Sequence, residues 1–234
     1  MPVTAYILTA LGAYLLGSIP TGFLVAKAKG VDIRSVGSGN IGATNAMRSL
    51  GKPAGIFVLL ADAAKGWFAC YWGMIIYSFV SLHYEGNIQT NADAEFVSNL
   101  VNHQHQDMQH FMLIAGIFAV LGHNYTCWLK FKGGKGIATT AGVYLALAPE
   151  ALGIALAVFI LTILVTRYVS VGSIVAAIAL PTAVWILQPH HLPLGIVTTA
   201  LGALAIYKHK SNIQRLLAGT ENRFGKKKTS EESK

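Results

Sequence analysis

One polar stretch near the N-terminus has residue types that could bind an anion. It reads Gly37-Ser38-Gly39-Asn40-Ile41-Gly42-Ala43-Thr44-Asn45, and the cations Arg48 and Lys52 follow it. Glycines leave backbone N–H groups accessible, and small polar side chains add donors, so such a segment can cradle a phosphate. A flexible connector between two helices has the same composition. The stretch alone leaves both interpretations open.

Two further segments carry similar chemistry. Gly133-Gly134-Lys135-Gly136-Ile137-Ala138-Thr139-Thr140 places glycines and a cation before an apolar run, where free N–H groups and Lys135 could hold a phosphate. It lacks the spacing of a Walker A motif, and a basic loop beside a membrane span would look alike. The segment 209–221, read as a helix, aligns His209, Asn212 and Arg215 along one side, and Glu221 is a lone acid that could pair with a cation.

The remaining sequence indicates what must position these segments. The 234 residues are 53% hydrophobic and 12% charged, and their mean hydropathy is +0.51. A soluble domain has about twice this charged fraction, and long apolar runs recur throughout, so we predict an all-α integral membrane protein. The net charge of +8 then reflects orientation and contact with anionic lipids, and we predict no nucleic-acid partner.

Length and charge predict seven transmembrane helices, several of them short, near residues 4–26, 53–80, 111–129, 137–149, 151–166, 172–188 and 194–207. Pro20 should kink the first span, whose small residues favour close helix packing. The stretch 137–165 could be one tilted span or two short ones. A break at Pro149 keeps the basic C-terminal segment inside, which favours two.

This topology places the N-terminus outside and the C-terminus in the cytoplasm. Every Lys and Arg except Lys65 then falls in a cytoplasmic segment, as expected for an inner (plasma) membrane protein with its active site facing the cytoplasm. We expect one membrane domain over 1–223 and a disordered basic tail over 224–234. All three polar segments share the cytoplasmic face, where they offer groups enough for two phosphates.

Several ionisable residues have more than one interpretation. Asp62 and Lys65 lie three residues apart inside a predicted span, where they could form an internal salt bridge or take part in a site. His123, at the end of another span, favours a structural hydrogen bond over a role as a base. The histidines between 103 and 110 are too loosely spaced for a metal site, so we predict no metal and no cofactor.

The motifs together resemble those of the PlsY family, the bacterial acyl-phosphate:glycerol-3-phosphate acyltransferases. The resemblance rests on the Gly37–Asn45 stretch with Arg48, on Gly133–Gly136 with Thr139, and on the 209–216 segment, and it extends from the first span to Glu221. Gly17-Ser18-Ile19-Pro20 and Asp62-x-x-Lys65-Gly66 match the family as well. The resemblance implies a seven-span enzyme that transfers a fatty acyl group from acyl phosphate to the 1-hydroxyl of glycerol 3-phosphate. The products would be lysophosphatidic acid and phosphate, in the first acylation of phospholipid synthesis.

The resemblance also implies roles for individual residues. Ser38, Arg48 and Lys135 would be catalytic and would contact glycerol 3-phosphate, with help from His209 and Asn212. The acyl phosphate cradle would comprise Gly37, Ser38, Gly39, Asn40, Gly42, Thr44, Asn45, Gly133, Gly134, Gly136 and Thr139. The partners implied are the two substrates, membrane lipids and a functional link to the enzyme that forms acyl phosphate.

The chemistry of the implied reaction is consistent with these residue types. Acyl phosphate is a mixed anhydride with a good leaving group, so no protein nucleophile is required, and positioning with charge stabilisation would suffice. None of the histidines has an Asp five residues later, which argues against the soluble type of glycerol-phosphate acyltransferase and its acyl-CoA donor. An organic-phosphate transporter is the alternative. Its binding groups would be expected near the midplane on broken helices rather than at one face.

Overall fold

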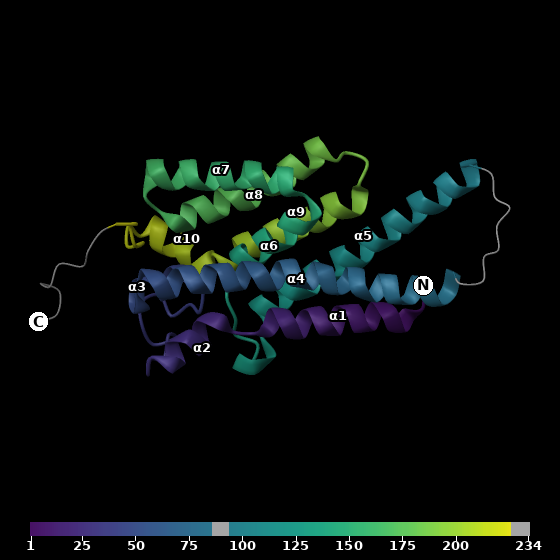
Figure 1. Ribbon diagram of the computed structural model, residues 1–234. Coiled ribbons are helices and arrows are strands. Elements are labelled where there is room, and N and C mark those ends of the chain that lie inside the picture. The colour runs from purple at the N-terminus through teal and green to yellow at the C-terminus, as the bar shows by residue number, and fades with distance from the viewer. Residues whose placement is uncertain (86–93, 226–234) are drawn as a thin grey trace, which may run out of the picture. The chain divides into compact units, whose positions relative to one another are not determined.

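The computed structural model describes residues 1–85 and 94–225, and every regular element in these ranges is helical (Figure 1). Most of the tail predicted to be disordered, residues 226–234, lies outside the described residues. The chain divides into two compact units, Met1–Pro149 and Glu150–Lys234. Each unit is described below by itself.

The first unit is a bundle in which the three long helices pack against one another. Helix α1 contacts α4 and α5, α4 contacts α5, and the shorter α6 packs against α4 and α5 (Figure 1). Helix α3 lies against the beginning of α4. The elements in order are α1 Val3–Ser18, α2 Thr21–Ala28, α3 Ala43–Leu50, α4 Lys52–Glu85, α5 Ala94–Asn124, the 3-10 helix η1 Cys127–Leu129, and α6 Ile137–Leu147.

Small residues allow this close packing. A Cβ on Gly17 of α1 would lie 2.2 Å from the carbonyl oxygen of Ala119 in α5. A Cβ on Gly142 of α6 would lie 1.8 Å from the carbonyl oxygen of Ala63 in α4. Both distances are far below van der Waals contact, so these helices touch backbone to backbone, as the small residues of the first span predicted. In lipid, where water does not drive helices together, such contact is a principal source of association.

The kink predicted at Pro20 is confirmed and separates α1 from α2. Helix α1 ends at Ser18, Ile19 and Pro20 form the break, and α2 begins at Thr21. Proline has no backbone N–H and its ring crowds the preceding turn, so it kinks or breaks a helix. The break leaves backbone groups inside the bundle that need partners from elsewhere.

The polar region between the second and third predicted spans contains more helix than the hydropathy pattern suggested. Helix α4 continues to Glu85, and α5 already begins at Ala94, well before the span predicted from residue 111. Residues 94–110 contain no Gly or Pro, so nothing in them interrupts the helix even though they are polar. Hydropathy reports where a helix leaves the membrane, and the helix itself extends further.

The second unit contains four helices in its described part, which ends at residue 225. They are α7 Pro149–Thr166, whose first residue closes the first unit, α8 Val169–Leu187, α9 Leu192–Lys208, and α10 Lys210–Leu217. Helices α8 and α9 pack against each other, and the Trp185 indole N–H donates to Thr199 Oγ1 at 3.1 Å. Helices α9 and α10 meet at His209 with a bend of 52°.

The lengths and hydropathy of these helices are those expected of an integral membrane protein. Five helical segments of the described chain are long and apolar enough to cross a bilayer, and the bent α9–α10 pair would make a sixth. Helix α6, with 11 residues, is apolar but shorter than the span predicted there. The five segments are Val3–Ala28, Lys52–His83, Gln106–Leu129, Pro149–Thr166 and Val169–Leu187.

Candidate active site

The first polar segment folds around the side chain of Asn45, which is only 2% exposed. Its Oδ1 accepts a hydrogen bond from the Ser38 backbone N–H at 2.8 Å. Its Nδ2 lies 2.9 to 3.2 Å from the carbonyl oxygens of Asn40, Val36 and Ile33, to which it donates. One buried carboxamide therefore holds four backbone groups, and it shapes the loop from within instead of facing outward.

Glycine is required at the tip of this loop for reasons of both conformation and space. Gly37 has φ 60° and Gly39 has φ 70°, in the left-handed region that favours glycine. A Cβ on Gly37 would also lie 2.2 Å from Asn45 Oδ1. The resulting tight loop leaves Ser38 exposed, and Thr44 and Arg48 are exposed one turn apart on the following helix α3.

The second polar segment runs along the end of helix α5. The Gly133 N–H donates to the Asn124 carbonyl at 3.2 Å, and the Gly134 N–H donates to the His123 carbonyl at 3.0 Å. Lys135 is half-buried, and Gly136 caps α6 with φ 83°. The N–H groups of Gly133 and Gly134 are therefore not free, contrary to what the sequence suggested, because they bind the end of α5. The loop is fixed on that side and leads directly into the first turn of α6.

Thr139 does not lie at the surface of this loop. Its side chain is fully buried in α6, and a Cβ on Gly66 of α4 would lie 2.2 Å from its carbonyl oxygen. It therefore belongs to the contact between α4 and α6.

A buried hydrophobic cluster links the first loop to η1, the element that precedes the second loop. Residues from the first loop and its flanking helices pack with Leu129 of η1, which leads into the second loop. The buried cluster consists of Ala26, Ile33, Ile41, Ala46, Val58 and Leu129. Their packing ties the loop that carries Ser38 and the helix that carries Arg48 to η1, which precedes the Lys135 loop in the chain.

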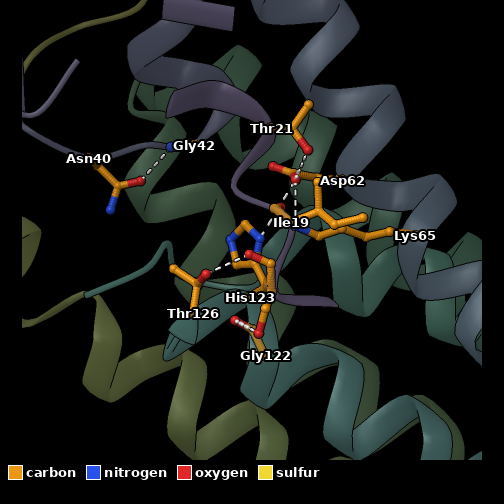
Figure 2. Close-up of polar contacts among 10 residues, drawn as sticks. Ile19, Thr21, Asn40, Gly42, Asp62, Lys65, Gly122, His123 and Thr126 are labelled. Atoms are coloured by element: carbon orange, nitrogen blue, oxygen red, sulfur yellow. Dashed lines mark hydrogen bonds and ion pairs between the residues drawn. The ribbon is translucent and has the colours of Figure 1, made fainter. Parts of the chain in front are cut away.

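Of the two interpretations left open for Asp62 and Lys65, the structure shows the internal salt bridge, which lies among further buried polar groups (Figure 2). Lys65 Nζ is 2.8 Å from Asp62 Oδ1, and their side chains are 5% and 3% exposed. Asp62 Oδ1 also accepts from Thr21 Oγ1 at 3.1 Å. Lys65 Nζ donates to the carbonyl of Ile19 at 2.8 Å, so it satisfies a backbone oxygen released by the Pro20 break.

His123 lies inside the bundle between this ion pair and the second loop. Its side chain is 5% exposed, and its Nδ1 lies 3.7 Å from Asp62 Oδ1. On the opposite edge of the ring, Nε2 is 2.1 Å from where a Cβ on Gly134 would be. The imidazole is therefore buried beside Asp62, and its contact with the glycine loop was not visible in the sequence.

The third polar segment belongs to the second unit and is organised around Glu221. Its Oε1 accepts from Asn212 Nδ2 at 2.9 Å and from Ser170 Oγ at 3.1 Å, and its Oε2 accepts from Arg215 Nε at 2.7 Å. Burial raises the pKa of Glu221, but these hydrogen bonds and the charge of Arg215 outweigh burial, and the net pKa is lowered. The predicted pairing of Glu221 with a cation is confirmed.

His209 and Asn212 are both buried, at 3% and 6% exposed. His209 Nδ1 lies 2.7 Å from the Ala205 carbonyl oxygen one turn earlier, which orients the ring at the bend between α9 and α10. The carboxamide of Asn212 donates to Glu221. Both residues are therefore held in defined positions by groups of their own unit.

Among the residues that the structure describes, no group of three or more His, Cys, Asp or Glu side chains could hold a metal. The side chains of His103 and His105, from the histidine-rich segment weighed above, lie outside the described residues.

Comparison with known proteins identifies the family. The family model described as glycerol-3-phosphate acyltransferase matches residues 7–219. The chain is 41% identical over 222 residues to the glycerol-3-phosphate acyltransferase of Geotalea daltonii, covering 95% of this chain and 99% of that protein. It is 47% identical over 218 residues to that of Geobacter metallireducens, covering 93% and 97%.

Solved structures agree with this assignment. The crystal structure of PlsY (YgiH), an integral membrane glycerol 3-phosphate acyltransferase, in its glycerol 3-phosphate form has a TM-score of 0.75 and 36% identity, with coverage of 94% and 96%. The lysophosphatidic acid form has a TM-score of 0.73 and 35% identity, with coverage of 94% and 95%. The resemblance inferred from the three motifs is confirmed. This chain belongs to the PlsY family of integral membrane glycerol-3-phosphate acyltransferases and is an acyltransferase.

Proposed function

We propose that the protein transfers a fatty acyl group from acyl phosphate to the 1-hydroxyl of glycerol 3-phosphate. The hydroxyl oxygen attacks the acyl carbonyl carbon, the bond between that carbon and the phosphate oxygen breaks, and the hydroxyl proton passes to a phosphate oxygen of the substrates. The products are lysophosphatidic acid and inorganic phosphate. The reaction is the first acylation of phospholipid synthesis.

The observation that carries this proposal is the buried cluster that includes Ile41 and Leu129. It ties the loop that carries Ser38 and the helix that carries Arg48 to η1, the element that precedes the Lys135 loop in the chain. Two cations, a hydroxyl and glycine-rich backbone suit a reaction in which negative charge develops on a carbonyl oxygen and a leaving phosphate. An acyl phosphate needs no covalent enzyme intermediate, so orientation of the two substrates supplies much of the remaining rate enhancement.

We assign Ser38, Arg48 and Lys135 to direct contact with substrate and to charge stabilisation. The exposed backbone around Ser38 and the Gly133–Gly136 loop form the cradle for acyl phosphate. The inward position of Asn45 refines its role, because its carboxamide already binds four backbone groups and contributes by holding Ser38 in place. Thr139 contributes in the same indirect way, by packing α6 against α4.

His209 and Asn212 of the second unit are proposed to help bind glycerol 3-phosphate. Both can donate hydrogen bonds, and both are oriented by their own neighbours, His209 by the Ala205 carbonyl and Asn212 by Glu221. A preoriented donor loses little conformational entropy when the ligand binds.

We further propose seven membrane spans, with the N-terminus outside, the C-terminus inside and the active site facing the cytoplasm from the inner membrane. The five candidate spans, the bent α9–α10 pair and the short helix α6 support this number. The confinement of Lys and Arg, apart from Lys65, to the segments placed inside supports the orientation. Because acyl phosphate is a reactive anhydride, the protein should work together with the enzyme that forms it.

A donor-swap assay tests the proposed function. The purified full-length protein, in detergent or lipid, should release phosphate from palmitoyl phosphate only when glycerol 3-phosphate is present, and lysophosphatidic acid should appear in equal amount. Palmitoyl-CoA in place of palmitoyl phosphate serves as the control and should give little product. Equal turnover with palmitoyl-CoA and none with palmitoyl phosphate would refute the donor. Uptake of glycerol 3-phosphate into vesicles without any acylation would support a transporter instead.

A further inference from the structure

We infer that His123 is a positioning residue for Lys135, acting through Gly134. This inference rests on the proposed role of Lys135 at the substrate phosphate. His123 is buried beside the Asp62–Lys65 ion pair and packs against the loop that carries the half-buried Lys135.

The His123 ring is held in place by a network of buried polar groups. Its Nδ1 faces Asp62 Oδ1 at 3.7 Å, and the same oxygen binds Lys65 Nζ at 2.8 Å and Thr21 Oγ1 at 3.1 Å (Figure 2). Lys65 in turn is tied to the Ile19 carbonyl at the break between α1 and α2. A ring surrounded by such a network at 5% exposure has little freedom to rotate.

The His123 ring also packs against the glycine loop. A Cβ on Gly134 would lie 2.1 Å from Nε2 and 2.8 Å from Cε1 of His123, so the ring presses directly on the Gly134 α-carbon. The His123 carbonyl also accepts the Gly134 N–H at 3.0 Å. Ring and backbone of one residue therefore fix Gly134 from two sides, and Lys135 is the next residue along the chain.

Position 134 requires glycine for lack of space and not for its backbone conformation. Its φ lies outside the left-handed region, unlike that of Gly136 at 83°. Position 134 can therefore adopt its backbone conformation with any ordinary residue, and the nearest obstacle to a side chain there is the His123 ring. At position 136 an added Cβ would be strained even if space were made.

This difference provides a second-site suppression test. In the double variant His123→Asn/Gly134→Ala, the methyl group of the new alanine would fill the place vacated by Nε2, and the asparagine amide would keep a donor near the position of Nδ1. His123→Asn alone leaves the loop without its support, and Gly134→Ala alone drives the loop away from the ring. The matched control is His123→Asn/Gly136→Ala, in which the same space is made but the strain at position 136 stays.

We expect each single variant to lose roughly 10- to 100-fold in kcat/KM for palmitoyl phosphate, since a displacement of about 1 Å in a reacting group can cost about 100-fold. The His123→Asn/Gly134→Ala double variant should recover roughly tenfold over Gly134→Ala, and His123→Asn/Gly136→Ala should not improve on Gly136→Ala. Tyr14→Phe, which removes a hydrogen bond of 2.7 Å to the Tyr125 carbonyl near the same helix end, should keep wild-type kcat/KM.

Amide hydrogen exchange gives a readout that does not depend on the reaction. In His123→Asn, the amides of residues 133–136 should exchange faster than in the wild type, while those in the middle of α4 should not change. Wild-type kcat/KM in His123→Asn, no recovery in the double variant, or unchanged exchange in the loop would each overturn the inference. If wild-type protein fails the donor-swap assay but His123→Asn still accelerates exchange in the loop, the proposed function fails and the structural role of His123 stands.

Discussion

Asp62 and Lys65 should be strongly coupled in the free energy of unfolding, so that replacing both residues costs less than the sum of the two single replacements. Lys65→Met would leave the Asp62 carboxylate buried without its cation, and Asp62→Asn would leave Lys65 without its anion. Breaking a buried ion pair from one side costs about 3–5 kcal/mol of unfolding free energy, because the remaining charge is uncompensated. Independent effects of the two substitutions would therefore sum to roughly 6–10 kcal/mol.

The double variant Asp62→Asn/Lys65→Met should lose much less than that sum. It contains no buried charge, and what stays lost is chiefly the hydrogen bond from Lys65 to the Ile19 carbonyl, 2.8 Å long in the wild type. The Ile19 carbonyl keeps one donor, because it also accepts from the Thr21 N–H at 3.0 Å. A hydrogen bond to a charged group contributes about 1.5–3 kcal/mol, and we expect the double variant to be destabilised by about this amount. The double variant should therefore be more stable than either single variant.

Unfolding in mixed micelles of increasing sodium dodecyl sulfate, followed by tryptophan fluorescence, would measure these free energies. Thr162→Val, which removes a hydrogen bond within α7 of the second unit, is a control for general loss of a polar group. If the loss in the double variant equalled the sum of the two single losses, the two residues would not be coupled and the reasoning from the ion pair would be wrong.

Three further predictions concern the polar segments. Arg48→Ala and Lys135→Ala should abolish turnover in the donor-swap assay while the protein stays folded, whereas Lys132→Ala, an exposed neighbour, should keep most of the activity; wild-type rates in either of the first two would refute the phosphate cradle. Asn45→Asp should reduce turnover at least about 100-fold, because a carboxylate oxygen would replace the Nδ2 group that donates to three carbonyl oxygens. Normal activity and normal resistance of the loop to proteolysis would contradict this prediction. The lowered pKa of Glu221 predicts a stabilising contribution that is complete above its ordinary value of 4.5 and is lost as pH falls through the lower folded value. The difference in melting temperature between wild type and Glu221→Gln should therefore shrink below pH 4.5, and a pH-independent difference would argue against this assignment.

Much of this architecture could be predicted from local patterns in the chain. Apolar runs indicated where helices cross the membrane, and Pro20 indicated the break between α1 and α2. The glycine-rich segments and their cations indicated the candidate site and the family. These features depend on properties of consecutive residues, such as hydropathy, a missing N–H or a left-handed φ, and such properties can be recognised without knowing what packs against them.

Which polar side chains face inward, and which groups they bind there, depends on how the helices pack. Asn45 and Ser38 are both small polar residues of the same glycine-rich stretch. Ser38 is exposed, whereas Asn45 is buried and organises the loop. His123 contacts Asp62, 61 positions away along the chain, and presses on Gly134 through its other edge. Which helices approach, and at what depth, depends on backbone-to-backbone packing such as that of Gly17 against Ala119, and a linear sequence does not state these pairings. The residue types set the chemistry available to this protein, and helix packing selects which groups support the site and which are left to act in it.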